Sequence, residues 1–431
     1  MNYTEVLILT LSFLVLLSIR VPVAYAIGLS GLFTLMVAMP FMPSVTTLAQ
    51  RMATSLDSFT LSAIPFFILA GQIMNKGGIA VRLINFAKAI VGPLPGGLAF
   101  VNIFACMLFG AISGSAVAAA SAIGGFMNPM MEKEGYDKPF SAAVNITSST
   151  TGLLIPPSNV LIIYSLASGG VSIAALFVAG YLPGLLIGFA LMMVAGVYSV
   201  IKKYPTEKLV SFKEFFKRFL DALPSLLLLV VVIGGIVAGI FTATEASAIA
   251  VIYTFVLAMA YKEISFKSIA SILLETIKTS SIVLLLIATS IAMSWVMSYE
   301  NIPQEISNAL LSVSENPIII LILINLILLF VGVFMDMTPA ILIFTPIFLP
   351  IVTDLGMNPI HFGIVMILNL CIGLCTPPVG SVLFVGCSVA ELSIQKVIRP
   401  LMPLFLIMIL VLVLITYIPQ LSLWLPKIFD L

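Results

Sequence analysis

A run of hydroxyl-bearing residues lies inside an apolar segment in the first half of the chain. Thr147-Ser148-Ser149-Thr150-Thr151-Gly152 is followed by Pro156-Pro157-Ser158-Asn159. Because proline lacks a backbone N–H and disfavours helix at the residue before it, we expect the helix to break here. A break frees carbonyl oxygens, and the nearby hydroxyls supply more, which suits a cation such as Na⁺. A lone hydroxyl more often bonds to its own backbone, but five in a row beside a glycine and two prolines favour a cation site.

The second half contains a similar break and a matching hairpin. Gly373-Leu374-Cys375-Thr376-Pro377-Pro378-Val379-Gly380 has fewer hydroxyls, so its predicted cation site depends more on backbone carbonyls. Ser113-Gly114-Ser115 and Asp336-Met337-Thr338-Pro339 would begin the second helix of each hairpin, where free amides and the positive dipole end attract anions. Asp336 is either a cation ligand or a helix N-cap. Gly114 and the small residues 116–122 are also typical of close helix packing.

These patterns predict two sodium half-sites and one substrate site. The first sodium half-site comprises Ser113, Gly114, Ser115, Thr147, Ser148, Ser149, Thr150 and Gly152. The second comprises Asp336, Thr338, Gly373 and Thr376. The predicted substrate contacts are Ser115, Pro156, Ser158, Asn159, Thr338, Pro377 and Gly380. We expect at least two bound Na⁺ ions, no other metal and no ATP.

The elements that position these residues must be membrane helices. The chain is 61% hydrophobic and only 9% charged, with a mean hydropathy of +1.23, whereas a soluble domain carries about 25% charged residues. Apolar stretches of the roughly 20 residues that a bilayer core requires recur from Val6 to Leu425. We therefore predict an all-α polytopic membrane protein with about eleven transmembrane helices and two re-entrant helical hairpins.

The charged residues and cysteines exclude some classes of function. The four cysteines lie in apolar segments, at spacings typical of neither a zinc site nor a disulfide framework. The net charge is +1 and no dense basic run occurs, which argues against nucleic-acid binding. No Lys or Arg is predicted deep within a span. An anion would therefore be held by helix N-termini, hydroxyls and co-bound cations.

The distribution of Lys and Arg predicts the orientation. All 19 except Arg51 and Lys427 fall on one side, which the positive-inside rule assigns to the cytoplasm. The opposite loops carry Glu300, Glu305, Glu315 and Asp354. Both termini are then periplasmic. This topology requires residues 98–131 and 317–352 to enter and leave the membrane on the same side.

The chain resembles itself at an offset of 221 residues. The offset pairs Pro156-Pro157 with Pro377-Pro378, and Gly152 with Gly373. Each half has an odd number of crossings and one hairpin, so the second copy is inverted, a pattern of secondary transporters. The predicted divisions are repeat 1 (1–200), a cytoplasmic basic linker (201–222) and repeat 2 (223–431), with hairpins at about 98–131 and 317–352 and broken helices at about 139–168 and 360–390.

Two further features have open interpretations. The amphipathic stretches 44–58 and 266–279 could lie in the membrane interface or form loops. Glu245 falls near the end of a span, at the interface.

The sequence resembles the large membrane subunit of tripartite ATP-independent periplasmic (TRAP) transporters. The motifs are Ile64-Pro65-Phe66-Phe67-Ile68-Leu69-Ala70-Gly71, Phe109-Gly110-Ala111-Ile112-Ser113-Gly114-Ser115-Ala116, residues 242–246, residues 335–339, and Thr376-Pro377-Pro378-Val379-Gly380. The family usually has proline at the position of Ala243, a departure that we expect to affect only local bending.

This resemblance implies a sodium-driven elevator transporter in the bacterial inner membrane, with scaffold and transport domains. It also implies a small four-helix membrane subunit and a soluble periplasmic substrate-binding protein as partners. Because the chain begins at its first span, we expect the small subunit to be a separate polypeptide. The implied substrates are organic anions such as C4-dicarboxylates, sialic acids or other sugar acids.

Other classes of function fit the sequence less well than a TRAP transporter subunit. An intramembrane serine protease needs a base, but His361 is predicted in a periplasmic loop far from Ser113, and Asp336 has no evident partner for an aspartyl protease. No Gly-Lys-Ser or Gly-Lys-Thr motif occurs, which argues against an ATP-driven pump. We therefore expect no enzymatic activity. A stand-alone divalent-anion/sodium symporter of similar fold is the main alternative, and a channel or scaffold is a weaker one.

Overall fold

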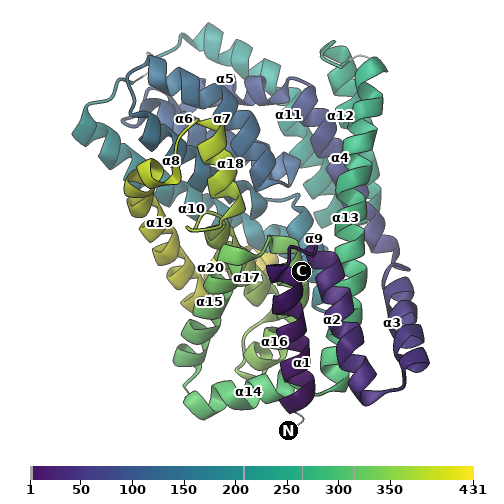
Figure 1. Ribbon diagram of the computed structural model, residues 1–431. Coiled ribbons are helices and arrows are strands. Elements are labelled where there is room, and N and C mark those ends of the chain that lie inside the picture. The colour runs from purple at the N-terminus through teal and green to yellow at the C-terminus, as the bar shows by residue number, and fades with distance from the viewer. Residues whose placement is uncertain (1–2, 207–208, 265, 315) are drawn as a thin grey trace.

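The computed structural model describes residues 3–206, 209–264, 266–314 and 316–431, and every regular element among them is a helix (Figure 1). Of the charged residues used for the predicted topology, Lys208 and Glu315 lie outside the described residues. The helices are α1 (Tyr3–Ser18), α2 (Val23–Ala38), α3 (Phe41–Ser55), η1 (Phe59–Ser62), α4 (Ala63–Lys76), α5 (Ile79–Val91), α6 (Gly97–Ser113), α7 (Ala116–Lys133), α8 (Lys138–Ser149), η2 (Thr151–Leu153), α9 (Asn159–Ala167), α10 (Ile173–Lys202), α11 (Phe212–Val237), α12 (Ala243–Ala260), α13 (Phe266–Tyr299), α14 (Ile302–Val313), α15 (Pro317–Phe334), α16 (Met337–Asp354), α17 (Pro359–Leu374), α18 (Ser381–Val389), α19 (Ile394–Tyr417) and α20 (Gln420–Ile428).

The helices are long and apolar enough for a multi-pass membrane protein. Within the described part of the chain, seven helices could cross a membrane by length and composition, or eight if the bent pair Phe41–Ser55 and Phe59–Lys76 is one span. Shorter apolar helices include Thr4–Ser18, Val23–Ala38, Gly97–Ala111 and Pro359–Leu374. The count of eleven crossings stays a prediction.

One group of helices, the arm group, comprises α1–α5 and α11–α13. In it α2 packs on α1 and α13, α4 packs on α12, and α5 packs on α11. The Arg82 guanidinium lies 3.4 Å from an Asp221 carboxylate oxygen and 3.6 Å from the centre of the Tyr261 ring. Because these residues belong to α5, α11 and the end of α12, the contacts tie three helices of the group together.

The structure shows the form of the two predicted amphipathic stretches and the position of Glu245. Residues 266–279 are neither a loop nor a separate interfacial segment, because they are the first turns of the 34-residue helix α13. Residues 41–55 do form a short helix, α3, which is joined to the next helices through a 65° bend. Glu245 accepts the Thr242 backbone N–H at 2.8 Å and so completes a capping box at the start of α12.

The second group, the hairpin group, comprises α6–α10 and α15–α20. Its centre is formed by α8 and α17, whose residues 140–149 and 361–374 are all buried. The Cys371 thiol donates to the Thr150 carbonyl at 3.5 Å, and the Cys375 thiol donates to the Ile146 carbonyl at 3.4 Å. These contacts join the two halves of the chain at the centre of the core.

Both central helices stop at the predicted breaks. Helix α8 ends at Ser149 and α9 begins only at Asn159, whereas α17 ends at Leu374 and α18 begins at Ser381. The intervening Pro156-Pro157 and Pro377-Pro378 bonds are both cis. Both proline pairs lie within the breaks, where their missing backbone N–H groups cost no helical hydrogen bond.

The placement of His361 was predicted wrongly. His361 lies in the first turn of α17 with 1% of its surface exposed, not in a loop. Its Nε2 lies 3.3 Å from the Thr416 carbonyl oxygen on α19. The imidazole is therefore a buried contact between α17 and α19.

Candidate functional site

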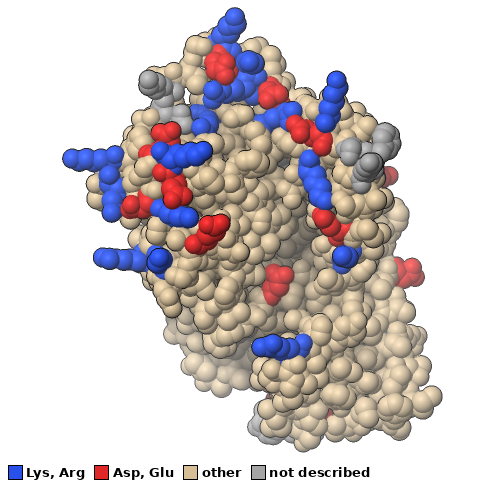
Figure 2. All heavy atoms as spheres, turned by 45° about the horizontal axis from the view of Figure 1, so that its top comes forward, with Lys and Arg blue, Asp and Glu red and all other residues tan. Residues whose placement is uncertain are grey.

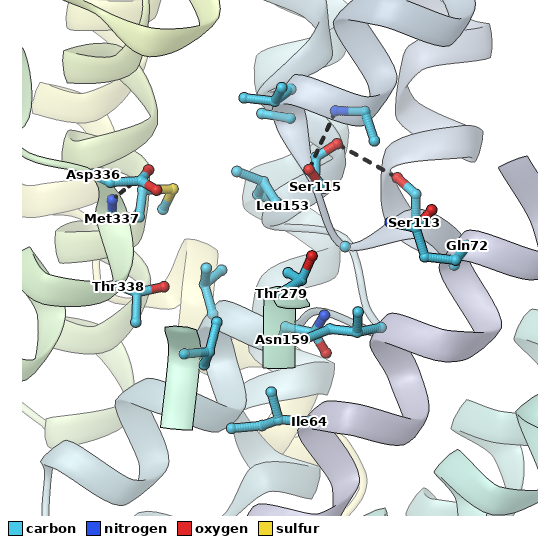
Figure 3. A pocket seen from close by; sticks show the side chains of 18 of the residues that line it. Ile64, Gln72, Ser113, Ser115, Leu153, Asn159, Thr279, Asp336, Met337 and Thr338 are labelled. Atoms are coloured by element: carbon cyan, nitrogen blue, oxygen red, sulfur yellow. Dashed lines mark hydrogen bonds between the residues drawn. The ribbon is translucent and has the colours of Figure 1, made fainter. Parts of the chain in front are cut away.

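A cavity of about 480 Å³ lies between the two hairpin turns and the arm helices α4 and α13. Figure 3 shows Asp336 and Thr338 on one side of it, and Ser113, Ser115 and Gln72 on the other. Its lining residues are Ile64, Ile68, Gly71, Gln72, Asn75, Ser113, Gly114, Ser115, Ala116, Val117, Ala118, Ser121, Leu153, Asn159, Val160, Ile163, Glu275, Thr279, Val283, Asp336, Met337, Thr338 and Leu374. The cavity thus joins both predicted hairpin turns in one site.

The first hairpin turn reverses the chain within two residues. Helix α6 ends at Ser113, and Gly114 has a φ of +62°, which glycine adopts without the steric penalty of a side chain. Ser115 caps α7, since its hydroxyl accepts the Ala118 backbone N–H at 3.2 Å. A Cβ on Gly114 would lie 2.9 Å from Asn159 Nδ2, so the turn also presses against the start of α9.

The second hairpin turn places Asp336 at the N-cap of α16. One carboxylate oxygen accepts the Met337 backbone N–H at 2.9 Å, while the residue stays exposed and lines the cavity. The N-cap interpretation is therefore met, and the same carboxylate remains accessible to a cation. Asp336 and Glu275 are the two acidic lining residues, and none of the lining residues is Lys or Arg.

Three helices begin at the cavity wall. Ala116 starts α7, Asn159 starts α9 and Met337 starts α16, and all three residues line the cavity. The first amides of a helix have no partner within the helix, and they carry the positive end of its dipole. At α7 and α9 the cavity can therefore attract an anion without a cationic side chain in its wall, whereas the N-terminus of α16 already has the Asp336 carboxylate as its cap.

The hydroxyl run in the first break is buried behind the cavity rather than in its lining. Each of its hydroxyls donates to a backbone carbonyl three or four residues earlier. The structure therefore shows the bonds to their own backbone that the sequence offered as the alternative to a cation site. A hydroxyl oxygen that donates still has lone pairs for a cation. These residues are Thr147, Ser148, Ser149, Thr150 and Thr151, each with 0% of its surface exposed.

Polar atoms without a partner occur after the first break. The Ser158 hydroxyl belongs to a residue with 1% of its surface exposed, and it has no hydrogen-bond partner among the described residues. The Asn159 Oδ1 atom is buried and lacks one as well. Because burying an unpaired polar atom costs free energy, these oxygens fit a cation or bound water. Pro156 is buried here too and does not line the cavity.

The second break contributes less to this cavity. The Thr376 hydroxyl donates to the Ile372 carbonyl at 2.8 Å, and the Gly380 N–H donates to the Thr376 carbonyl at 3.1 Å. The lining of the cavity does not include Gly373, Thr376, Pro377 or Gly380. Of the predicted residues, the structure therefore brings together the two hairpin turns and Asn159.

The arm side of the cavity was missed by the sequence interpretation. Gln72 and Asn75 of α4, and Glu275 and Thr279 of α13, all line it. Their spacings of three and four residues place each pair on one face of its helix. Polar residues at that spacing inside an apolar helix were the signal that could have identified this wall.

Comparison with known proteins gives concordant matches. The family described as Tripartite ATP-independent periplasmic transporter, DctM component, matches residues 10–421. A Salmonella typhimurium protein designated YgiK is 57% identical over 424 residues, which are 98% of this chain and 98% of that protein. The C4-dicarboxylate TRAP transporter large permease protein DctM of Pseudomonas aeruginosa is 41% identical over 403 residues, 93% of this chain and 94% of that protein.

Two further matches extend the comparison. The sialic acid TRAP transporter large permease protein SiaM of Vibrio cholerae is 40% identical over 384 residues, which cover 88% of this chain and 89% of that protein. The crystal structure of the Alcanivorax borkumensis YdaH transporter has a TM-score of 0.66 at 13% identity, and the match covers 89% of this chain and 88% of that one. The similarity to the YdaH structure shows a shared fold.

Proposed function

This chain belongs to the DctM component family of tripartite ATP-independent periplasmic (TRAP) transporters, and we propose that it carries small organic anions across the bacterial inner membrane with a sodium gradient. It is a multi-pass membrane permease of that family. The observation that carries the proposal is the convergence of three helix N-termini on one cavity whose lining residues include no Lys or Arg.

The substrate class follows from the cavity and from the relatives. Helix N-termini favour carboxylates and similar anions, and about 480 Å³ accommodates a small organic acid. The relatives described above are named as permeases for C4-dicarboxylates and for sialic acid. A carboxylate-bearing acid of that size is therefore the proposed cargo.

The charge of the site supports the proposed sodium coupling. The cavity wall contains two carboxylates, of which Glu275 is paired with Lys76 and Asp336 has no cationic partner among the described residues, and an anionic substrate adds further negative charge. Bound Na⁺ would offset that charge. The oxygens that fit it are the Asp336 carboxylate, the unpartnered oxygens of Ser158 and Asn159, and the buried hydroxyls of residues 147–151. We propose at least two such ions, one for each half of an inverted repeat.

An elevator movement agrees with the way the two groups meet. The arm group would be the scaffold, and the hairpin group would carry both hairpin turns past it. The two groups touch closely where Gly71 of α4 meets the first turn, since a Cβ on Gly71 would lie 2.9 Å from the Ser113 carbonyl oxygen. A small residue at that contact allows the surfaces to slide.

The orientation proposed from the charges agrees with the surface. Figure 2 shows Lys and Arg gathered toward one end of the molecule, with a hollow between the two groups. In Figure 1 that end carries α5, and the N-terminus of α1 and helix α14 lie at the other. We assign the basic end to the cytoplasm and both termini to the periplasm.

The proposed partners are a separate small four-helix membrane subunit and a periplasmic substrate-binding protein. A stand-alone symporter of similar fold would need neither. Affinity purification of the tagged chain from its native membrane distinguishes the two, because only the tripartite assembly yields a stoichiometric small membrane partner.

Uptake in proteoliposomes tests the function itself. The complex with its partners is reconstituted and given radiolabelled C4-dicarboxylates and sialic acid. We expect accumulation of one class of acid only when an inward Na⁺ gradient is present, with no effect of ATP. Equal uptake with an inward K⁺ gradient would contradict the proposal.

A further inference from the structure

An ion pair lies at the edge of the cavity, on the arm side. The Lys76 ammonium, at the end of α4, lies 3.1 Å from a Glu275 carboxylate oxygen on α13. It also donates to the Ser271 hydroxyl at 3.0 Å. Glu275 and Asn75, the neighbour of Lys76, both line the cavity. The pair is therefore continuous with the site although Lys76 itself does not line it.

The Lys76–Glu275 pair lies at the proposed cytoplasmic opening of the cavity. Helix α5 begins three residues after Lys76, and Figure 1 places α5 at the basic end of the molecule. The Lys76 and Glu275 side chains are 33% and 49% exposed, so water reaches both of them. An anion that leaves the hairpin turns toward this end passes Glu275, whose charge alone would repel it.

Lys76 can act on such an anion directly. An ammonium group has three N–H donors, and two of them are used by Glu275 and Ser271. The third has no acceptor among the described residues and can be donated to a carboxylate. None of the lining residues is Lys or Arg, and among the described residues Lys76 is the cationic side chain that bonds directly to one of them, Glu275.

We propose that Lys76 and Glu275 form an exit subsite for the carboxylate of the departing substrate. Lys76 receives the anion at the cytoplasmic mouth, and Glu275 offsets the Lys76 charge so that the anion is not retained. This subsite rests on the proposed function for the identity of its ligand. Its electrostatic role is independent of which acid is carried.

Charged thiol reagents measure this role without any substrate. Thr279 lines the cavity, is exposed and lies one helical turn beyond Glu275, so Thr279→Cys places a reporter beside the pair. The native thiols do not compete, because Cys106, Cys371, Cys375 and Cys387 are at most 3% exposed. In the purified full-length chain, the rate of modification by anionic sulfonatoethyl methanethiosulfonate is divided by the rate for its cationic trimethylammonium analogue.

The two partners of the pair should change this ratio in opposite directions. Lys76→Gln should lower the anionic-to-cationic ratio about fivefold, because Glu275 is left unbalanced. Glu275→Gln should raise it about fivefold for the converse reason. The double variant should return to within about twofold of the parent, and Lys76→Arg should keep the parent ratio and so report that the fold is intact.

Lys213→Gln is the matched control, since Lys213 is exposed on α11 and has no salt bridge among the described residues. The exit subsite is overturned if both single variants leave the ratio unchanged, if they shift it in the same direction, or if the control shifts it equally. Absence of sodium-driven uptake in the parent complex, with the opposite shifts retained in the variants, would instead count against the proposed function alone.

Discussion

At the scale of single residues, one side chain is often compatible with two predicted roles at once. The hydroxyls of residues 147–151 bond to backbone carbonyls of their own helix, and the lone pairs that a cation requires remain. Asp336 caps α16 and also lines the cavity. The sequence could not separate such roles, because the same residue types satisfy both. Substitutions that remove one role and keep the other are therefore the informative ones.

Asp336→Asn is such a substitution. Asparagine caps a helix about as well as aspartate, so the free energy of unfolding should change by less than about 0.5 kcal/mol. The negative charge is lost, and the sodium concentration for half-maximal uptake should rise on the order of tenfold, about 1.4 kcal/mol. Sodium titrations of uptake, alongside thermal unfolding in detergent, check both parts.

The comparison variant is Asp336→Ala, which removes the cap as well and should destabilise the protein by about 1 kcal/mol. If Asp336→Asn keeps the sodium dependence of the parent, Asp336 acts only as a cap and the cation site lies elsewhere.

At the scale of elements, each half packs its first hairpin helix against its break through a pair of glycines. Gly110 of α6 meets Gly152, and Gly332 of α15 meets Gly373. A Cβ on Gly152 would lie 2.3 Å from Gly110 Cα, and one on Gly373 would lie 2.6 Å from Gly332 Cα. The backbones are in direct contact, so the hairpin helices and the broken helices form one unit in each half.

Gly152→Ala tests this packing. Because the nearest atoms belong to backbone, α6 has to move to admit the methyl group, and we expect a loss of about 1–3 kcal/mol of stability. Gly125→Ala is the control, since no atom lies within 4 Å of a Cβ at Gly125 of α7. It should be neutral or stabilise the helix by up to about 1 kcal/mol. Thermal unfolding of both purified variants gives the comparison, and equal midpoints would refute the contact.

The sequence predicted local breaks better than long-range placement, for a physical reason. Proline pairs and the Ser113-Gly114-Ser115 turn act within a few residues, and the helices end where these signals stand. The arm side of the cavity, with Gln72 and Thr279, depends on how α4 and α13 pack against the hairpins. The spacing of the polar residues marks one face of each helix, but it does not show which other helices that face meets. The start of α17 was also missed at His361, where the Asn358 side chain accepts the Ile360 backbone N–H and Pro359 begins the helix.

At the scale of the whole molecule, the two groups of helices meet around the cavity with few fixed charges between them. Both acidic lining residues have partners within their own group, since Asp336 caps α16 and Glu275 pairs with Lys76. The contact between Gly71 and the first hairpin turn is a close approach of two backbones rather than an ion pair. An interface without ion pairs resists sliding less than an interface held by ion pairs. This agrees with the proposed elevator movement of the hairpin group past the arm group.

A disulfide across that contact tests the movement itself. A Cβ at position 71 would lie 3.3 Å from Ser113 Cα and 2.9 Å from the Ser113 carbonyl oxygen, so cysteines at both positions are within bridging range once the turn shifts slightly to admit the new side chain. We expect the oxidised Gly71→Cys/Ser113→Cys variant to lose sodium-driven uptake and to regain it on reduction with dithiothreitol. Each single variant serves as a control, because the buried native thiols offer no partner. Uptake that continues in fully cross-linked protein would mean that the first hairpin turn stays beside α4 throughout the cycle, and the elevator assignment would be wrong.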